Sequence, residues 1–303
     1  MQSNMTMEAW IKNRKTNVKG SSLKTYKSYE QAHLLPFFGD TPLRAISRKK
    51  IRKFKKYLSK KLAPKTVKDI LSYLKTILKA AEKKGYLKSP EMPKVRVQAK
   101  EKEILDRRSQ QALSERVRQS QNPQDMAVYI SLTLGLRIGE VLGLRIKDVD
   151  LEGGVLRVRK NRQRVYDPQT SRYPVVSLSP KTKSSIRDIP LAASVKAVLA
   201  HFLENRDHRP KKLLITGKNG RPCDTRTVQR HFAGLKKELG LSPKLTFHSL
   251  RHSFATRALE AGAEMNTLSA FLGHASVSFT LSRYGHCVTA QKREQMEKIA
   301  ACF

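Results

Sequence analysis

The chain has 303 residues, and its 61 Lys and Arg outnumber its 25 Asp and Glu to give a formal net charge of +36. Hydrophobic residues make up 39% of it, which excludes a disordered basic tail, and the lack of an 18-residue apolar run excludes a membrane-spanning helix. The excess charge favours a polyanionic partner, and nucleic acid is favoured over an acidic membrane surface. Three scattered cysteines and the lack of a signal-peptide core in residues 1–10 predict a cytoplasmic protein.

The first third of the chain is predicted to be a basic, helical domain. Residues 1–100 hold 26 Lys and Arg against 6 Asp and Glu, so one third of the chain carries more than half of the net charge. Helical patterns begin at Ser21 and Ser22 and again at Pro64, and Gly85 is expected to end the second helix. We therefore expect residues 1–90 to form a helical DNA-binding domain.

Residues 48–61 are the most basic stretch of this domain. Ile51, Phe54 and Leu58 fall on one helical stripe, which predicts one buried face and one basic face. The basic face is interpreted either as an ordinary solvated surface or, as we prefer at this charge density, as a surface for backbone phosphates. The predicted DNA-binding residues are Lys49, Lys50, Arg52, Lys53, Lys55 and Lys56.

A change of pattern separates this domain from the rest. Residues 91–104 are charged, contain a proline and lack periodicity, so they are expected to be an extended linker. Beyond it, residues 105–303 alternate helical stretches with short strand-like pieces at 155–159, 174–178 and 186–189. The predicted fold class is therefore mainly α with a small antiparallel β-sheet, an α+β protein of two domains.

The segment 245–262, LTFHSLRHSFATRALEAG, holds the densest group of chemically active side chains. His248, Arg251 and His252 have i, i+3, i+4 spacing and can project from one helical turn. Two histidines at i, i+4 also fit zinc, but Ser249 replaces the glutamate of the usual motif and Arg251 would repel a metal. A phosphodiester suits an imidazole beside a guanidinium better, and no metal is expected.

Two further segments hold candidates whose interpretation the residues alone leave open. Arg137 lies in the apolar stretch LTLGLRIGEVLGL, where Glu140 is one turn away, so the two residues form either a structural ion pair or a guanidinium oriented by a carboxylate. His274 follows Gly273, and Tyr284 comes ten residues later. A lone tyrosine is usually a packed aromatic, but beside a bound phosphate its phenol becomes a candidate nucleophile.

Taken in order, LGLRIGE, PKTKSSIRDIP, HSLRH and LGHASVSFTLSRY resemble the motifs of the tyrosine recombinase (phage integrase) family. Within that family, the sequence most resembles the integrases of phages and conjugative transposons. The resemblance covers most of 105–303 and implies a catalytic domain there, preceded by a core-binding (SAM-like) domain and carrying a C-terminal tail helix. An additional domain for arm-type DNA sites, usual in those integrases, is not expected within the chain.

The resemblance also implies the reaction and the role of each site residue. Tyr284 attacks the scissile phosphate, which forms a 3′-phosphotyrosyl bond and frees a 5′-hydroxyl. Lys181 is expected to protonate the leaving oxygen from a hairpin spanning 175–190, and Lys183 is its nearest competitor. No cofactor is needed, because ligation reverses cleavage. The residues expected to hold the phosphate are Arg137, His248, Arg251 and His274, with Glu140 behind Arg137.

The partners implied are double-stranded DNA at specific core sites and further copies of the chain. A homotetramer is expected on two synapsed duplexes and a monomer or weak dimer off DNA, with an excisionase or a DNA-bending protein as further partners and no membrane. The tail after Tyr284 either folds on its own domain or docks on a neighbouring protomer. Competing interpretations are a Xer-like or phase-variation recombinase, a type IB topoisomerase, and a non-catalytic DNA-binding protein.

Overall fold

The protein is described here from a computed structural model. The structure describes residues 5–14, 20–98, 103–165, 167, 169–170, 172–179, 183–204, 206, 209–284, 296 and 300. Within these ranges the chain is mainly helical with short antiparallel strands, which confirms the predicted fold class. None of the described helices is both long and apolar enough to cross a bilayer.

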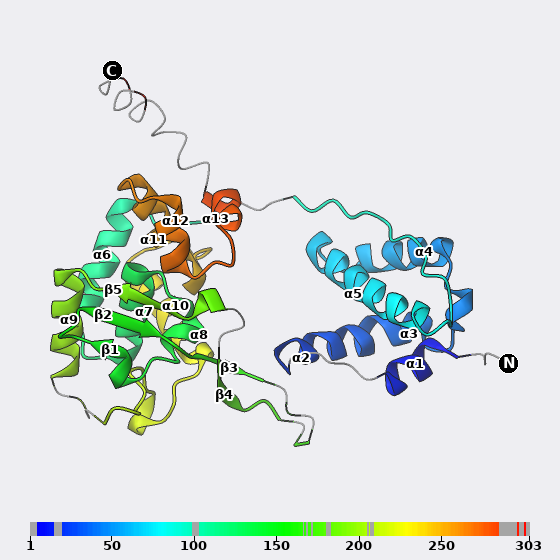
Figure 1. Ribbon diagram of the computed structural model, residues 1–303, viewed down its shortest axis with the longest axis horizontal. Helices are drawn as coiled ribbons and strands as arrows, with labels where there is room; N and C mark the ends of the chain where they lie inside the picture. The colour runs from blue at the N-terminus through cyan, green and yellow to red at the C-terminus, as the bar shows by residue number, and fades with distance from the viewer. Residues whose placement is uncertain are drawn as a thin grey trace. The chain divides into compact units, whose positions relative to one another are not determined.

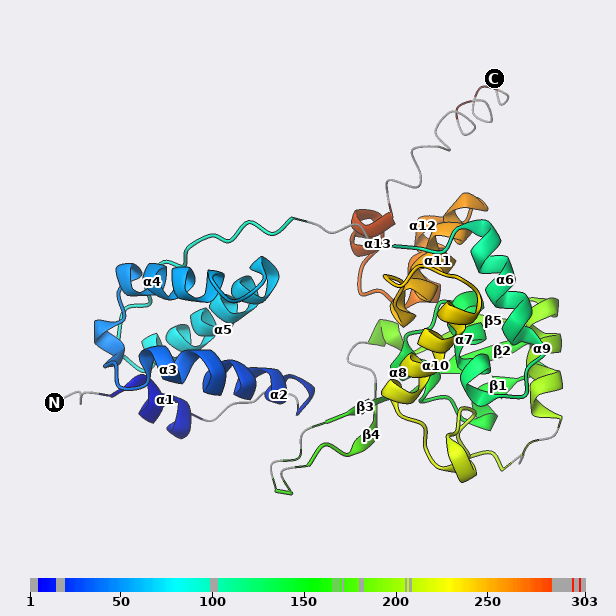
Figure 2. The same cartoon turned by 180° about the vertical axis from the view of Figure 1, so that it is seen from behind.

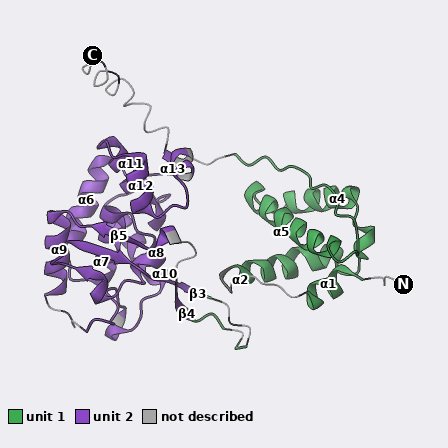
Figure 3. Ribbon diagram, viewed as in Figure 1, with its two compact units in different colours: residues 1–100, 164–174 green, residues 101–163, 175–303 purple. Residues whose placement is uncertain are grey.

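The chain divides into two compact units, shown in different colours in Figure 3. Unit 1 consists of residues 1–100 together with 164–174, and unit 2 consists of residues 101–163 together with 175–303. Each unit has its own buried apolar core.

Unit 1 is a small helical domain in which amphipathic helices enclose one core. Its longest helix, α5, starts at Pro64, where a missing N–H costs nothing, and buries Ile70, Leu74 and Ile77. The α4 stripe of Ile51, Phe54 and Leu58 is buried as predicted. The helices, shown in Figure 1, are α1 (Met7–Asn13), α2 (Gly20–Tyr29), α3 (Leu35–Phe38), α4 (Arg48–Ser59) and α5 (Pro64–Glu82), with a π-helical turn η1 (Glu30–Leu34) between α2 and α3 and a 3-10 turn η2 (Leu43–Ala45) after α3.

The extended segment after α5 is attached to unit 1. Met92 and Val95 pack against its core, and Arg48 forms an ion pair with Glu91 at 3.1 Å. The Lys55 ammonium donates to the backbone carbonyl of Lys94 at 2.9 Å. The first part of the predicted linker thus contributes apolar surface to the helical domain.

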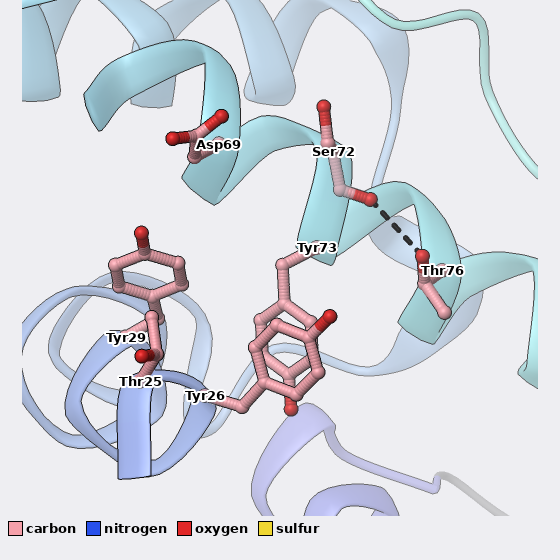
Figure 4. Close-up of a pocket in the computed structure, with 7 residues that line it drawn as sticks. All are labelled: Thr25, Tyr26, Tyr29, Asp69, Ser72, Tyr73 and Thr76. Atoms are coloured by element: carbon pink, nitrogen blue, oxygen red, sulfur yellow. Dashed lines mark hydrogen bonds between the residues drawn. The ribbon is translucent and has the colours of Figure 1, made fainter. Parts of the chain in front are cut away.

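A cavity of about 300 Å³ lies between α2 and α5 (Figure 4). Hydroxyl groups dominate its lining, and the rings of Tyr26 and Tyr73 stack with their centroids 4.0 Å apart. Burial raises the pKa of Tyr29, and the nearby Asp69 carboxylate raises it further. The only charged side chain among its lining residues is the Asp69 carboxylate, while the Arg14 guanidinium lies over the Tyr73 ring, 5.4 Å from its centroid. The lining residues are Thr25, Tyr26, Tyr29, Asp69, Ser72, Tyr73 and Thr76.

Unit 2 packs helices around a small antiparallel sheet, as Figures 1 and 2 show. In the three-stranded sheet, β2 lies between β1 and β5, and helix α9 runs beside it. The helices are α6 (Arg107–Arg118), α7 (Pro123–Leu134), α8 (Ile138–Val141), α9 (Ala193–Leu203), α10 (Thr225–Glu238), α11 (Phe247–Glu260), α12 (Met265–Leu272) and α13 (Val277–Tyr284). The strands are β1 (Val149–Asp150), β2 (Val155–Val158), β3 (Asn161–Arg164), β4 (Val175–Leu178) and β5 (Arg187–Pro190). The 3-10 turns are η3 (Ile146–Asp148), η4 (Lys183–Ser185) and η5 (Lys218–Gly220).

The pairing of the strands corrects one prediction. Residues 175–190 were expected to form a hairpin, but β4 pairs with β3 and β5 pairs with β2. Leu156 lies opposite Ile189 in the β2–β5 ladder, and both are buried. The apolar face of β5 therefore selects β2 as its partner, because that register places Ile189 in the core.

A buried polar network joins three helices of unit 2. Asp125 of α7 is bonded to His231 of α10 at 2.6 Å and accepts from the Ser120 hydroxyl at 2.6 Å, while Arg116 of α6 lies 3.4 Å away. Burial acts to raise the pKa of Asp125, but the hydrogen bonds of His231 and Ser120 outweigh it and hold the pKa below its usual value. The ionised carboxylate therefore stabilises the folded unit.

We expect Asp125→Asn to lower the free energy of unfolding by about 1.5–3 kcal/mol at pH 6, because hydrogen bonds to a charged group are lost. The wild-type advantage is fully present above the unfolded aspartate pKa of about 3.9. It is lost as the pH falls through the lower folded value. Urea unfolding between pH 6 and pH 3 measures the difference. Asp188→Asn, at the half-exposed pair with Arg159, is the control and should cost less than about 1 kcal/mol. An equal loss for both variants would contradict the network's role.

Candidate active site

A buried carboxylate, Glu140, lies at the centre of a cluster of three arginines in unit 2. Glu140 occupies the third position of helix α8 and accepts from the backbone N–H of Arg137 at 2.9 Å, which caps the helix. Its other oxygen accepts from the Arg137 guanidinium at 2.8 Å. The Glu140 side chain is 5% exposed and that of Arg137 is 37% exposed, so the pair joins the interior to the surface.

Two more arginines reach Glu140 from distant parts of the chain. Arg187, at the start of β5, donates to it at 3.0 and 3.3 Å. Arg251, on helix α11, lies 4.0 Å from it and has a side chain that is 2% exposed. Burial acts to raise the pKa of Glu140, but the charge and hydrogen bonds of Arg187, with those of Arg137, outweigh it and lower the pKa. Glu140 is therefore ionised.

Backbone carbonyls at the carboxyl ends of two helices accept hydrogen bonds from Arg251 and Arg137. Arg251 donates to Gly135 at the end of α7 at 2.8 Å and to Leu272 at the end of α12 at 2.6 Å. Arg137 also donates to the Leu272 carbonyl, at 3.3 Å. These carbonyls have no partner within their helices and carry partial negative charge, so they stabilise buried cations.

The lack of a side chain at Gly273 allows the backbone to turn next to the arginine cluster. Gly273 ends α12 in the left-handed region with φ of 61°, which glycine adopts without steric cost. A Cβ at this position would lie 2.9 Å from a terminal nitrogen of Arg187. Glycine thus permits both the turn and the close approach of the guanidinium.

The cluster has a surplus of positive charge. Three guanidiniums surround one carboxylate, and burial lowers the pKa of Arg251 to about 9, with the charge of Arg137 acting in the same direction. Repulsion among the arginines is relieved when an anion binds them. Guanidiniums suit oxyanions such as a phosphodiester, because their forked N–H groups match pairs of oxygen atoms.

Three histidines lie near Arg251, two on its own helix α11 and one after the end of α12. His248, exposed in the first turn of α11, meets the buried His252 edge to face with ring centroids 4.6 Å apart. His274, directly after α12, is bonded through Nδ1 to the Thr280 hydroxyl at 2.7 Å. The i, i+4 spacing thus brings the two α11 rings into contact, as the sequence predicts.

Tyr284, the last residue of α13, is buried. Its side chain packs with Ala255, Leu259 and Leu272 and is 4% exposed. Its hydroxyl is bonded to Nδ1 of His252 at 2.5 Å. Leu272, which packs with Tyr284, also accepts from the Arg251 guanidinium through its backbone carbonyl at 2.6 Å.

The structure brings together most of the predicted site residues and leaves one outside its described part. Arg137, Glu140 and Arg251 meet directly, while Lys181 and the side chain of Lys183 lie outside the described residues. So does the tail after Tyr284, apart from Met296 and Ala300. On α4, Lys50 donates to Thr41 and Lys55 to Lys94. The other predicted DNA-binding residues, which are exposed, are Lys49, Arg52, Lys53 and Lys56.

Two features of this cluster, the pairing of Arg187 with Glu140 and the contact of His252 with Tyr284, are not indicated by the local sequence. Arg187 lies within the quoted motif PKTKSSIRDIP, but nothing in the local sequence indicates that it pairs with a carboxylate 47 positions earlier. His252 was noted at i+4 from His248, and its partner Tyr284 lies 32 positions away. Among the described residues, no group of three or more His, Cys, Asp or Glu could hold a metal ion.

Comparisons with known proteins identify the family of the chain. Residues 98–291 match the phage integrase family, and residues 4–59 match the N-terminal SAM-like domain of phage integrases. A XerC-like tyrosine recombinase of Caldanaerobacter subterraneus is 27% identical over 83% of this chain and 70% of its own length. A putative prophage phiRv2 integrase of Mycobacterium tuberculosis is 28% identical over 95% of this chain and 75% of its own length.

A solved structure shares the fold. The integrase of transposon Tn1549, in complex with a circular intermediate DNA, superposes with a TM-score of 0.79 at 23% identity, covering 93% of this chain and 95% of that one. At this identity the likeness concerns the fold.

We expect Glu140→Gln to destabilise unit 2 by about 3–5 kcal/mol, because it leaves buried guanidiniums without their counter-charge. Urea unfolding at pH 7 and low salt measures the loss. Sulfate should restore part of it, since an oxyanion can replace the missing charge. The matched control, Glu238→Gln, acts on the half-exposed pair with Arg116 and should cost less than about 1 kcal/mol. A Glu140→Gln loss no larger than the control's would contradict the central role of Glu140.

Proposed function

The chain belongs to the phage integrase family, and from this premise we propose that it is a site-specific DNA recombinase that integrates or excises a mobile element. It cuts and rejoins strands of double-stranded DNA through a covalent 3′-phosphotyrosyl intermediate. Similarity to a prophage integrase supports the mobile-element role.

One observation carries the proposal: a buried arginine cluster with surplus positive charge lies beside a buried tyrosine. Arg137 is partly exposed and Arg251 is fully buried, so the cluster can receive an anion at the surface and hold it against fixed charges. Charge that develops on the phosphate during attack is stabilised by cations that need not reorganise. Tyr284 supplies a nucleophile next to these cations.

In the proposed reaction, the Tyr284 oxygen bonds to phosphorus while the bond from phosphorus to the 5′-oxygen breaks. Arg137, Arg251, His248 and His274 hold the non-bridging oxygens, and Lys181 gives its proton to the leaving oxygen. Rejoining reverses these steps. The phosphotyrosyl bond stores the energy of the broken ester, so the reaction needs no nucleotide.

Basic residues outside the site are proposed to bind the DNA backbone. The exposed α4 residues Lys49, Arg52, Lys53 and Lys56 form a surface for phosphates, with Lys50 and Lys55 beside them. Two duplexes exchange strands only when their sites are brought together, so we propose a tetramer during the reaction. In this proposal most of the positive charge contributes to DNA affinity, and only a few cations take part in the cleavage reaction.

Tyr284→Phe is expected to bind DNA as the wild type does and to form no covalent complex, since the nucleophilic oxygen is gone. The measurement uses a nicked suicide duplex with the cognate site, in EDTA, followed by denaturing electrophoresis. A wild-type adduct that Tyr284→Phe lacks supports the mechanism. Absence of any wild-type adduct would indicate a non-catalytic DNA-binding protein. Relaxation of supercoils without exchange between two marked duplexes would indicate a topoisomerase.

Lys181→Ala is expected to slow cleavage by about 10²- to 10⁴-fold, because general acid catalysis contributes that much. A 5′-bridging phosphorothiolate has a better leaving group and should restore cleavage in Lys181→Ala. Lys183→Ala is the matched control and should gain no more than the wild type from the sulfur. Rescue of Lys183→Ala instead would show that the acid is Lys183.

A further inference from the structure

We propose that His252 is the group that positions the Tyr284 hydroxyl and accepts its proton through Nδ1 during attack. The inference rests on the proposed recombinase function and deepens it. It assigns the general base, which neither the motifs nor the comparisons identify.

The geometry already has the form that proton transfer requires. Nδ1 of His252 and the Tyr284 hydroxyl oxygen are 2.5 Å apart, and each side chain is 4% exposed, so both atoms are shielded from bulk water. A phenol has a pKa near 10 and is almost fully protonated at pH 7. It must lose its proton as it attacks, and a general base within hydrogen-bond reach removes that cost.

The other groups around Tyr284 are poorer acceptors. Arg137, Arg187 and Arg251 carry donors only. Glu140 is ionised but is engaged by the Arg137 and Arg187 guanidiniums, which lower its pKa. A carboxylate of lowered pKa is a weak base toward a phenol.

Two other imidazoles near this site, those of His274 and His248, have other contacts. Nδ1 of His274 is bonded to Thr280 at 2.7 Å. His248 is exposed on the first turn of α11 and meets His252 through an edge-to-face ring contact. This position suits His248 for donating to a phosphate arriving from solvent, while His252 lies behind it against the nucleophile.

The step balances without a further reagent. Neutral His252 carries its proton on Nε2 and accepts the phenolic proton at Nδ1 while the oxygen–phosphorus bond forms and the bond to the 5′-oxygen breaks. The leaving oxygen takes a proton from the general acid. In rejoining, the imidazolium returns its proton to the tyrosine oxygen. Arg251 precedes His252 on α11, and its guanidinium donates to the carbonyl of Leu272, which packs with Tyr284, so its positive charge can stabilise the developing phenolate.

The arrangement also explains why the acceptor is on α11. His252 and Arg251 are adjacent on one rigid helix that is anchored by the Gly135 and Leu272 carbonyls. The helix therefore fixes the base and the phosphate-binding cation relative to each other. Tyr284 lies at the end of α13 and reaches this pair when its ring packs against Leu259 and Leu272.

The test compares His252→Asn with wild type in single-turnover cleavage of the suicide duplex. An asparagine oxygen can replace Nδ1 as a hydrogen-bond acceptor but cannot take the proton at neutral pH. We expect cleavage to slow by about a hundredfold or more, within the range of general base catalysis, while DNA binding is retained. His201→Asn, at an exposed histidine of α9 bonded to Glu204, is the matched control and should cleave at the wild-type rate.

A more acidic nucleophile distinguishes a general base from a residue that only supports the structure, because it should raise the cleavage rate most in a variant that lacks the base. With a fluorinated tyrosine at position 284, the phenol ionises more readily, so His252→Asn should regain much of its rate and wild type should gain less. His248→Asn should show no such excess gain. Unfolding temperatures of all variants show whether folding is intact.

Two results would overturn the assignment. One is cleavage by His252→Asn at the wild-type rate. The other is a slow His252→Asn that fluorination fails to rescue, or an excess rescue in His248→Asn. If wild type itself forms no adduct, the proposed function fails, and this outcome is distinct from both.

Discussion

The ionised carboxylate of Glu140 is the interaction on which the rest of the site depends. It caps helix α8, and it pairs with Arg137 from the same turn, with Arg187 from β5 and with Arg251 from α11. Burying a charge costs several kcal/mol unless partners compensate it, so these elements must come together for any of them to be stable in this place. The ends of α7 and α12 complete the enclosure with backbone carbonyls.

This constraint leads directly to the chemistry. One carboxylate cannot neutralise three guanidiniums, and the imbalance remains as an attraction for an oxyanion at the partly exposed Arg137. The same packing that buries Arg251 also buries Tyr284 and its bond to His252. Stability and proposed reactivity therefore use the same residues, which is why a change at Glu140 should be felt both in unfolding and at the phosphate.

The features that depend on neighbouring residues can be predicted from the sequence. The α4 stripe of Ile51, Phe54 and Leu58, the start of α5 at Pro64 and the facing rings of α11 all follow from helical spacing and terminal residues. The short helix α1 was not predicted, and β4 was predicted to pair with β5, whereas it pairs with β3. Its sequence is apolar enough for a strand, but its partner is β3 and not β5, which local spacing does not specify.

The sequence by itself determined the composition of the site: basic surface, ordered motifs, and the pairing of Arg137 with Glu140 one turn apart. Each of these depends on charge or on contacts within a few residues, which local spacing specifies. Only the tertiary structure decided that Arg187 shares that carboxylate and that His252 holds Tyr284. These contacts join residues 47 and 32 positions apart, and they exist because helices and a strand pack around one buried charge.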